Sequence, residues 1–151
     1  MSKSRKLRAA FKAIFEPAMR EAGYDVAYPN FCRAEGEVLH LVMVQPWTYG
    51  GAFTIEFGVQ RGPFHNGNDE LVPPETLEVD YLPLPSRARL GPGEAQPKRD
   101  RSPSPDHYAY ARIADDRAAL DELMREVAGH IPQIDAWLRD GTVSPNIHPY
   151  D

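Results

Sequence analysis

The side chains of this chain that could take part in chemistry are polar and aromatic residues on predicted strands. A histidine or carboxylate in a pocket can act on a substrate when its pKa is perturbed, and arginines and tyrosines can bind a polar or anionic group. If the strands belong to one sheet with an open face, these side chains line a polar concave surface. The candidate ligand- or partner-binding residues are His40, Thr54, Glu56, Arg87, Arg89, Tyr108 and Tyr110.

Two interpretations of this surface are open. In the first, it is a solvated outer sheet face with ordinary cross-strand ion pairs, such as Glu56 with an arginine. In the second, it is the site of a small-ligand-binding protein or a hydrolase that uses His40, Glu56, Arg87, Arg89 and Tyr110. The second interpretation requires a pocket that brings at least three of these side chains within hydrogen-bond reach.

An acidic run lies on a proline-rich stretch between the predicted strands. No lysine or arginine occurs between Gly62 and Arg87, so the negative charge is not balanced locally. Such a patch favours a basic protein partner through electrostatic steering, and a merely solvated loop is the alternative. The residues of this acidic patch are Asp69, Glu70, Glu75, Glu78 and Asp80.

Sequence motifs for catalysis, cofactors and metals are missing. The run Gly91-Pro92-Gly93 begins like a dinucleotide fingerprint but has no strand-turn-helix unit around it. The 5 histidines show no HExxH spacing, and the single cysteine, Cys32, has no local histidine partner. We therefore predict no catalytic residue, no cofactor and no metal site.

Charge and hydropathy limit the partners. Residues 1–20 carry six basic side chains and one acidic one, whereas the whole chain has a net charge of -5. A basic amphipathic helix can bind nucleic acid or a membrane, but its apolar stripe indicates core packing and the acidic remainder repels phosphate. The longest apolar run, residues 38–44, is far shorter than the roughly 20 residues of a membrane span. The lone cysteine and the lack of a signal-peptide pattern predict a cytoplasmic protein. The uneven charge and the missing catalytic motifs predict that its partner is another protein.

The helices that must support these residues are predicted from apolar residues that recur with the 3.6-residue period of an α-helix. Apolar residues at helical spacing predict a helix over residues 4–22, with a kink or break near Glu16 because Pro17 interrupts it. The same spacing predicts two helical pieces near the C-terminus, over residues 117–129 and 132–140.

The strands follow from short β-prone runs and alternation. Residues 31–34 and 38–45 are predicted to form a hairpin, and residues 52–60 form a strand with one buried face. Shorter strands are predicted over residues 86–90 and 108–113. The resulting fold class is α+β, with an antiparallel sheet of four to five strands and the N-terminal and C-terminal helices packed on one face.

Proline divides this single predicted domain, residues 1–151, into patterned ends and an irregular middle. Nine of the 15 prolines lie in residues 61–106, which predicts a loop-rich insert partly pinned to the core by apolar residues. Residues 91–106 are predicted to be a surface loop, and residues 142–151, which show no period, a flexible tail.

The order of several short motifs resembles a known family. The motifs are Phe11-Lys12-Ala13-Ile14, Gly23-Tyr24, Asn30-Phe31-Cys32-Arg33, Gly36-Glu37-Val38, Gln45, and Phe53-Thr54 followed by Gly58. In this order they resemble the N-terminal half of the bacterial domain-of-unknown-function family 4304, over about residues 7–60, with residues 108–138 fitting more loosely. The resemblance implies an α+β domain with helices at both ends, and it implies no known activity, catalytic residue or cofactor. The leading functional prediction is a non-catalytic protein–protein interaction module, of the kind that neutralises a toxin.

Overall fold

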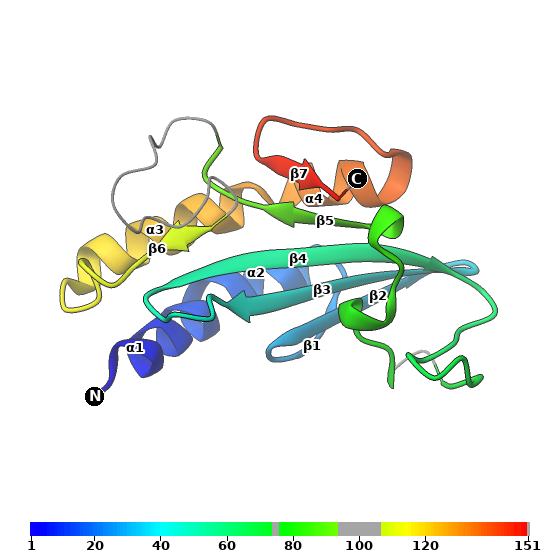
Figure 1. The fold of residues 1–151 in the computed structure, drawn as a ribbon. Helices are drawn as coiled ribbons and strands as arrows, with labels where there is room; N and C mark the ends of the chain where they lie inside the picture. The colour runs from blue at the N-terminus through cyan, green and yellow to red at the C-terminus, as the bar shows by residue number, and fades with distance from the viewer. Residues whose placement is uncertain (74–75, 94–106, 151) are drawn as a thin grey trace.

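The strands of the chain form one antiparallel sheet in a computed structural model that describes residues 1–73, 76–93 and 107–150 (Figure 1). The strand order is β1-β2-β3-β4-β5-β7, and β6 pairs with the beginning of β4 outside this order. The bounds are β1 (Asp25–Ala27), β2 (Asn30–Glu35), β3 (Val38–Pro46), β4 (Ala52–Arg61), β5 (Arg87–Leu90), β6 (Tyr108–Ala109) and β7 (Ile147–Pro149).

The α-helices of the described residues pack on one face of this sheet, behind the strands in Figure 1. They are α1 (Lys3–Ala10), α2 (Glu16–Glu21), α3 (Arg117–Gly129) and α4 (Ile131–Asp140). Aromatic rings fill the space between the layers: Phe11 meets Phe53 edge-on with centroids 5.0 Å apart, and Phe57 meets Trp137 at 5.4 Å. The predicted α+β class, with helices from both chain ends on one sheet face, is confirmed. None of the described helices has the length and apolar character to cross a membrane.

The N-terminal helix passes Pro17 without a break. Between α1 and α2 lies a π-helical turn, η1 (Phe11–Phe15), in which the backbone N–H of Glu16 donates to the carbonyl of Phe11. Proline has no N–H and its ring collides with the carbonyl four residues earlier, and a widened turn is a common way to accommodate such a defect. At the position of the predicted kink or break near Glu16, the structure thus has this wider turn and no interruption of the helix.

The opposite face of the sheet is partly covered by the insert. Three outward residues of β3, Leu39, Leu41 and Met43, form a second apolar cluster with insert residues Leu77, Val79 and Leu82. Two short 3-10 turns, η3 (Val79–Tyr81) and η4 (Leu84–Ser86), carry the insert across this face, in front of the strands in Figure 1. The prediction that the insert is pinned to the core agrees with this contact, but the expectation of an open sheet face was wrong here.

The sheet is larger than the four to five strands predicted. The additional strands β1 and β7 have three residues each, too few to show a period of two. Strand β7 lies within residues 142–151, which were predicted to be a flexible tail, and it pairs with β5. The predicted strand over residues 108–113 is confined to Tyr108–Ala109, after which the chain turns. The predicted surface loop 91–106 lies mostly outside the described residues.

Candidate functional site

A cluster of polar side chains surrounds Glu56 on the sheet face opposite the helices. Pairing of β4 with β5 sets Glu56 opposite Arg89, and Gly58 opposite Arg87. The Nε of Arg89 donates to one carboxylate oxygen of Glu56 at 2.9 Å, and Nη2 of Arg87 donates to the other at 3.1 Å. The structure thus brings together three of the predicted site residues.

Two further side chains complete this group, which we call the Glu56 cluster (Gln45, Glu56, Arg87, Arg89 and Tyr150). The hydroxyl of Tyr150 donates to Glu56, and the amide nitrogen of Gln45, in the orientation that satisfies it, donates to both carboxylate oxygens. Burial, and then the hydrogen bond to Glu56, raise the pKa of Tyr150 above its usual value, so the phenol keeps its proton and remains a donor. The guanidinium carbons of Arg87 and Arg89 lie 5.3 and 5.1 Å from the centre of the Tyr150 ring.

The Glu56 cluster is built as a clamp between strands. Glu56 is 0% exposed, and its oxygens accept hydrogen bonds from β3, from β5 and from the residue after β7. Thr54 lies on the same face of β4, and its hydroxyl donates to the carbonyl of Leu90 at 3.1 Å. Because donors from β3, from β5 and from Tyr150 occupy both oxygens of the Glu56 carboxylate, the cluster joins β3, β4 and β5 to the segment after β7.

The other predicted site residues lie on the opposite, helix-covered face. Pairing of β3 with β4 sets His40 opposite Val59 and Met43 opposite Glu56, so His40 points away from the Glu56 carboxylate. Tyr108 stacks on Phe53 with centroids 5.4 Å apart, and Tyr110 lies 6.2 Å from the same ring. The prediction of one polar surface that includes His40, Tyr108 and Tyr110 was therefore wrong.

His40 belongs to a second polar network, which the sequence did not predict. Its Nδ1 faces two guanidinium nitrogens of Arg33, Nε at 3.1 Å and Nη2 at 2.8 Å. Arg33 Nη2 also lies 3.1 Å from the carboxylate of Asp135 on α4, which accepts a hydrogen bond of 2.9 Å from the Tyr24 hydroxyl. Arg33 further donates to the carbonyl of Ala22 at 2.9 Å. The network therefore ties β2, β3 and α4 to the end of the N-terminal helix.

The stability of the protein should decrease on acidification because of His40. Burial, and then the charge of Arg33, lower the pKa of His40 in the folded protein, whereas the unfolded chain keeps a value of about 6.5. Below about 6.5 the unfolded state binds more protons, so the contribution of neutral His40 is present at higher pH and is lost as the pH falls towards the folded pKa. Urea denaturation of wild type and His40→Gln between about pH 8 and pH 5 measures this. The difference in unfolding free energy between the two proteins should shrink on acidification; a constant difference would contradict a neutral, buried His40.

The acidic patch lies mainly on the exposed part of the insert. Asp69 and Glu70 are exposed in a turn that Asn66 organises, because its side-chain oxygen accepts from the backbone N–H groups of Asn68 and Glu70 at 2.9 and 3.1 Å. Among the other members, Glu78 is half-buried, Asp80 is exposed with its carboxylate 3.6 Å from Arg87, and Glu75 lies outside the described residues.

Apolar side chains are exposed in the same part of the insert. Leu71 is 71% exposed, Tyr81 41% and Leu84 49%. The ring of Tyr81 lies over Gly67, since a Cβ added to this glycine would come within 3.2 Å of the ring. Tyr81 therefore sits beside the turn that carries Asp69, Glu70 and Leu71.

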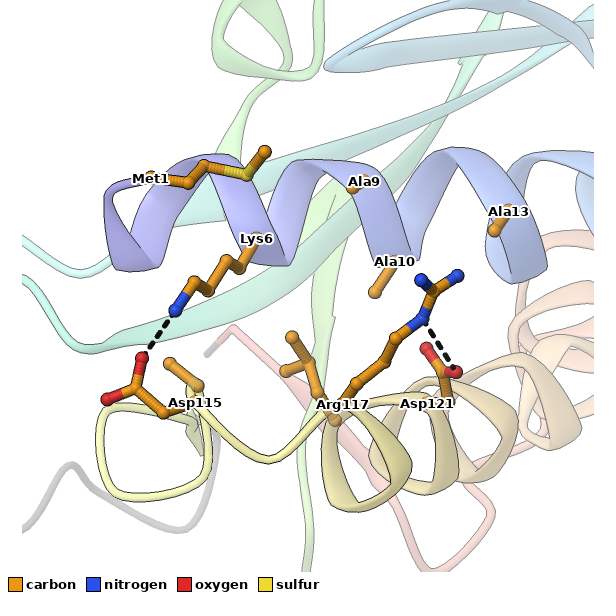
Figure 2. Close-up of a pocket in the computed structure, with 10 residues that line it drawn as sticks. Met1, Lys6, Ala9, Ala10, Ala13, Asp115, Arg117 and Asp121 are labelled. Carbon is orange, nitrogen blue, oxygen red and sulfur yellow. Dashed lines mark hydrogen bonds and ion pairs between the residues drawn. The ribbon is translucent and has the colours of Figure 1, made fainter.

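A cavity of about 320 Å³ lies between α1 and the beginning of α3 (Figure 2). Alanines, among them Ala9, Ala10 and Ala13, line its apolar wall. Lys6 pairs with Asp115 on one side, and Arg117 lies 3.8 Å from Asp121 on the other. Its charged residues are thus already paired within the chain. Across the described residues, no group of three or more His, Cys, Asp or Glu side chains is placed to hold a metal ion.

Four functional neighbours were not predicted from the sequence: Gln45 and Tyr150 in the Glu56 cluster, and Arg33 and Asp135 in the network of His40. One signal for Tyr150 was present: it follows His148 at a spacing of two residues, as expected for one face of a strand. The remaining partners come from segments far apart in the chain, and no local pattern connects them.

These features define the class of the protein as two-layered α+β, with helices from both chain ends on one sheet face and a buried Glu–Arg clamp on the other. The chain belongs to the family described as Domain of unknown function (DUF4304), whose model matches residues 15–140. The resemblance predicted from the short motifs is thereby confirmed. No curated protein and no solved structure matches the chain.

Proposed function

We propose that this protein is a non-catalytic interaction module of the cytoplasm that binds a basic protein through the exposed part of its insert. We call this part the insert surface, and define it by Asp69, Glu70, Leu71, Asp80, Tyr81 and Leu84. A basic toxin that the protein neutralises is one partner with this chemistry.

The observation that carries the proposal is the exposure of apolar and acidic side chains together. Exposed apolar side chains that are grouped together mark protein interaction sites, and aromatic residues are enriched among those that carry the binding energy. Tyr81 lies beside the turn that carries Asp69, Glu70 and Leu71, and no lysine or arginine occurs between Gly62 and Arg87. Acidic side chains near apolar anchors accelerate the encounter with a basic partner and disfavour acidic ones.

The alternative function, a small-ligand-binding protein or hydrolase, finds less support in the geometry. Its five residues divide between two faces of the sheet: Glu56, Arg87 and Arg89 on one, His40 and Tyr110 on the other. A proton exchanged between His40 and Glu56 would have to cross the sheet.

The proposal is tested by partner capture with charge-matched variants. Wild type, the insert variant Asp69→Asn/Glu70→Gln/Asp80→Asn, and a control variant Glu21→Gln/Glu122→Gln/Glu126→Gln are immobilised and exposed to a native lysate. The control removes the same number of carboxylates from exposed positions on the helices. A captured protein is identified by mass spectrometry, purified, and titrated against all three proteins by calorimetry.

We expect a basic protein that binds wild type and the control equally and the insert variant at least tenfold more weakly, about 1.4 kcal/mol. Tyr81→Ser should weaken binding by a similar factor, because it removes an aromatic anchor. Equal affinity for the insert and control variants, or capture of no basic protein, would reject the proposal.

A further inference from the structure

A groove of about 280 Å³ runs along the end of the sheet at strand β1, between β1 and β2 on one side and turn η3 on the other. Its floor is apolar and comes from both layers, with Cys32 and Leu41 from the sheet and Leu77 and Val79 from the insert. A volume of this size accommodates one or two aliphatic side chains rather than a large cofactor.

The rim of this groove is negatively charged. Asp25 and Glu78 both line it, and no lysine or arginine is among the residues that do. Asn30, also in the lining, has a buried side-chain oxygen that finds no hydrogen-bond donor within the described residues. The groove therefore combines an apolar floor with acceptors and carboxylates, which suits a ligand that supplies hydrogen-bond donors and positive charge.

The strand beside the groove is an edge. β1 stands at one end of the strand order and pairs only with β2 among the described strands. The side of an edge strand away from its neighbour presents backbone N–H and C=O groups that an extended peptide can pair with, and its alternate side chains then enter adjoining pockets. The three residues of β1 limit such pairing to a short stretch.

From these observations we infer that the groove binds an extended, cationic segment of the protein partner. The segment adds to the edge of β1, places an aliphatic side chain over Leu41 and Val79, and sets a lysine or arginine beside Asp25 and Glu78. This inference rests on the proposed function, since Glu78 belongs to the acidic patch of the insert, but it assigns a separate surface and a chain conformation to the contact.

The experiment uses the full chain and a displayed library of random peptides, which favours no chemistry in advance. Enriched peptides are synthesised and titrated against wild type, the groove variant Asp25→Asn/Glu78→Gln, and the charge-matched variant Asp69→Asn/Glu70→Gln. A third variant, Ala34→Phe, fills the groove from an exposed position on β2 and leaves every charge in place. Thermal unfolding of each variant shows that the fold is retained.

We expect enriched peptides to carry lysine or arginine next to aliphatic residues. The groove variant and Ala34→Phe should each weaken binding at least tenfold, whereas Asp69→Asn/Glu70→Gln should change it less than twofold. On peptide binding, the backbone amides of residues 25–27 should become protected against hydrogen exchange.

Three results would overturn the inference. If no peptide is enriched, or if the enriched peptides are acidic, the groove does not bind a cationic segment. If neither the groove variant nor Ala34→Phe weakens binding, the peptides bind elsewhere on the protein. If the protein forms a dimer without peptide and Ala34→Phe dissociates that dimer, the groove binds a second copy of the chain instead. Each of these leaves the proposed function standing if the partner capture still depends on Asp69, Glu70 and Asp80, so the two failures are distinguishable.

Discussion

Glu56→Gln is expected to lower the free energy of unfolding by about 3 to 5 kcal/mol, the usual loss when one partner of a buried ion pair is removed. Glu56 is fully buried, and Arg87 and Arg89 keep only 13% and 24% of their side chains exposed. A glutamine side chain has the same shape as glutamate, but its NH₂ group would point towards at least one of the donors that now bind the carboxylate. Two guanidinium groups would then lose the buried carboxylate that they share, and a donor would face a donor. Urea denaturation monitored by circular dichroism measures the change.

The matched control for this substitution is Glu122→Gln, which removes the same charge from an exposed position on α3. It should change the unfolding free energy by less than about 0.5 kcal/mol. Tyr150→Phe, which deletes one donor to the same carboxylate, should cost about 1.5 to 3 kcal/mol. A loss below about 1 kcal/mol for Glu56→Gln would show that the cluster does not clamp the sheet.

Gly58→Ala is expected to destabilise the protein by about 1 to 3 kcal/mol through overpacking between the sheet and the insert. A Cβ at residue 58 would lie 2.5 Å from the Leu82 Cδ1 atom and 2.8 Å from the backbone oxygen of Ser86. The leucine could rotate, but the backbone of Ser86 is held in turn η4, so the insert would have to move away from β4. Differential scanning calorimetry gives the loss as a lower melting temperature.

Gly129→Ala is the control for Gly58→Ala. Gly129 is the last residue of α3, and a Cβ there would meet no atom within 4 Å. Alanine is preferred to glycine in helices by roughly 0.5 to 1 kcal/mol, so this variant should be as stable as wild type or slightly more stable. If both alanine variants behave alike, the insert is not closely packed on β4.

Glu56→Gln and Gly58→Ala also bear on the proposed function, because both substitutions act where the insert meets the sheet. The insert returns to the sheet at Arg87, which binds Glu56 and also approaches Asp80 at 3.6 Å. Loosening either contact should therefore reduce binding of a basic partner along with stability, whereas a substitution on α3 should affect neither.

The helices and the long strands were predicted because their signals are local. The β2–β3 hairpin shows this: Glu35 pairs with Val38 around Gly36, whose φ of +63° favours glycine. β3 is apolar on both faces, and both are covered, by helices on one side and by Leu77, Val79 and Leu82 on the other. Such local patterns are the same whichever distant segment packs on the strand.

The structure brings together only part of the predicted site, namely Glu56 on β4 with Arg87 and Arg89 on β5. Arg87 and Arg89 are two residues apart on β5 and had to point the same way, and both reach Glu56. His40 was placed wrongly because its face depends on the register between β3 and β4. Met43 pairs with Glu56, so the even-numbered residues of β3 and those of β4 lie on opposite faces of the sheet. A hairpin loop one residue longer or shorter would have reversed this result.

The sequence by itself determined the class of the fold, the position of the main helices and strands, the family, and the separation of an acidic, proline-rich insert from two patterned ends. Each of these depends on composition or on periodicity within about ten to twenty residues. Only the tertiary structure decided that the C-terminal residues form a strand beside β5, that Tyr150 completes the Glu56 cluster, and that His40 pairs with Arg33 behind the sheet. The reason is physical: strand register and long-range pairing are set by how the layers pack. That packing brings together residues that lie far apart in the chain and share no local sequence pattern.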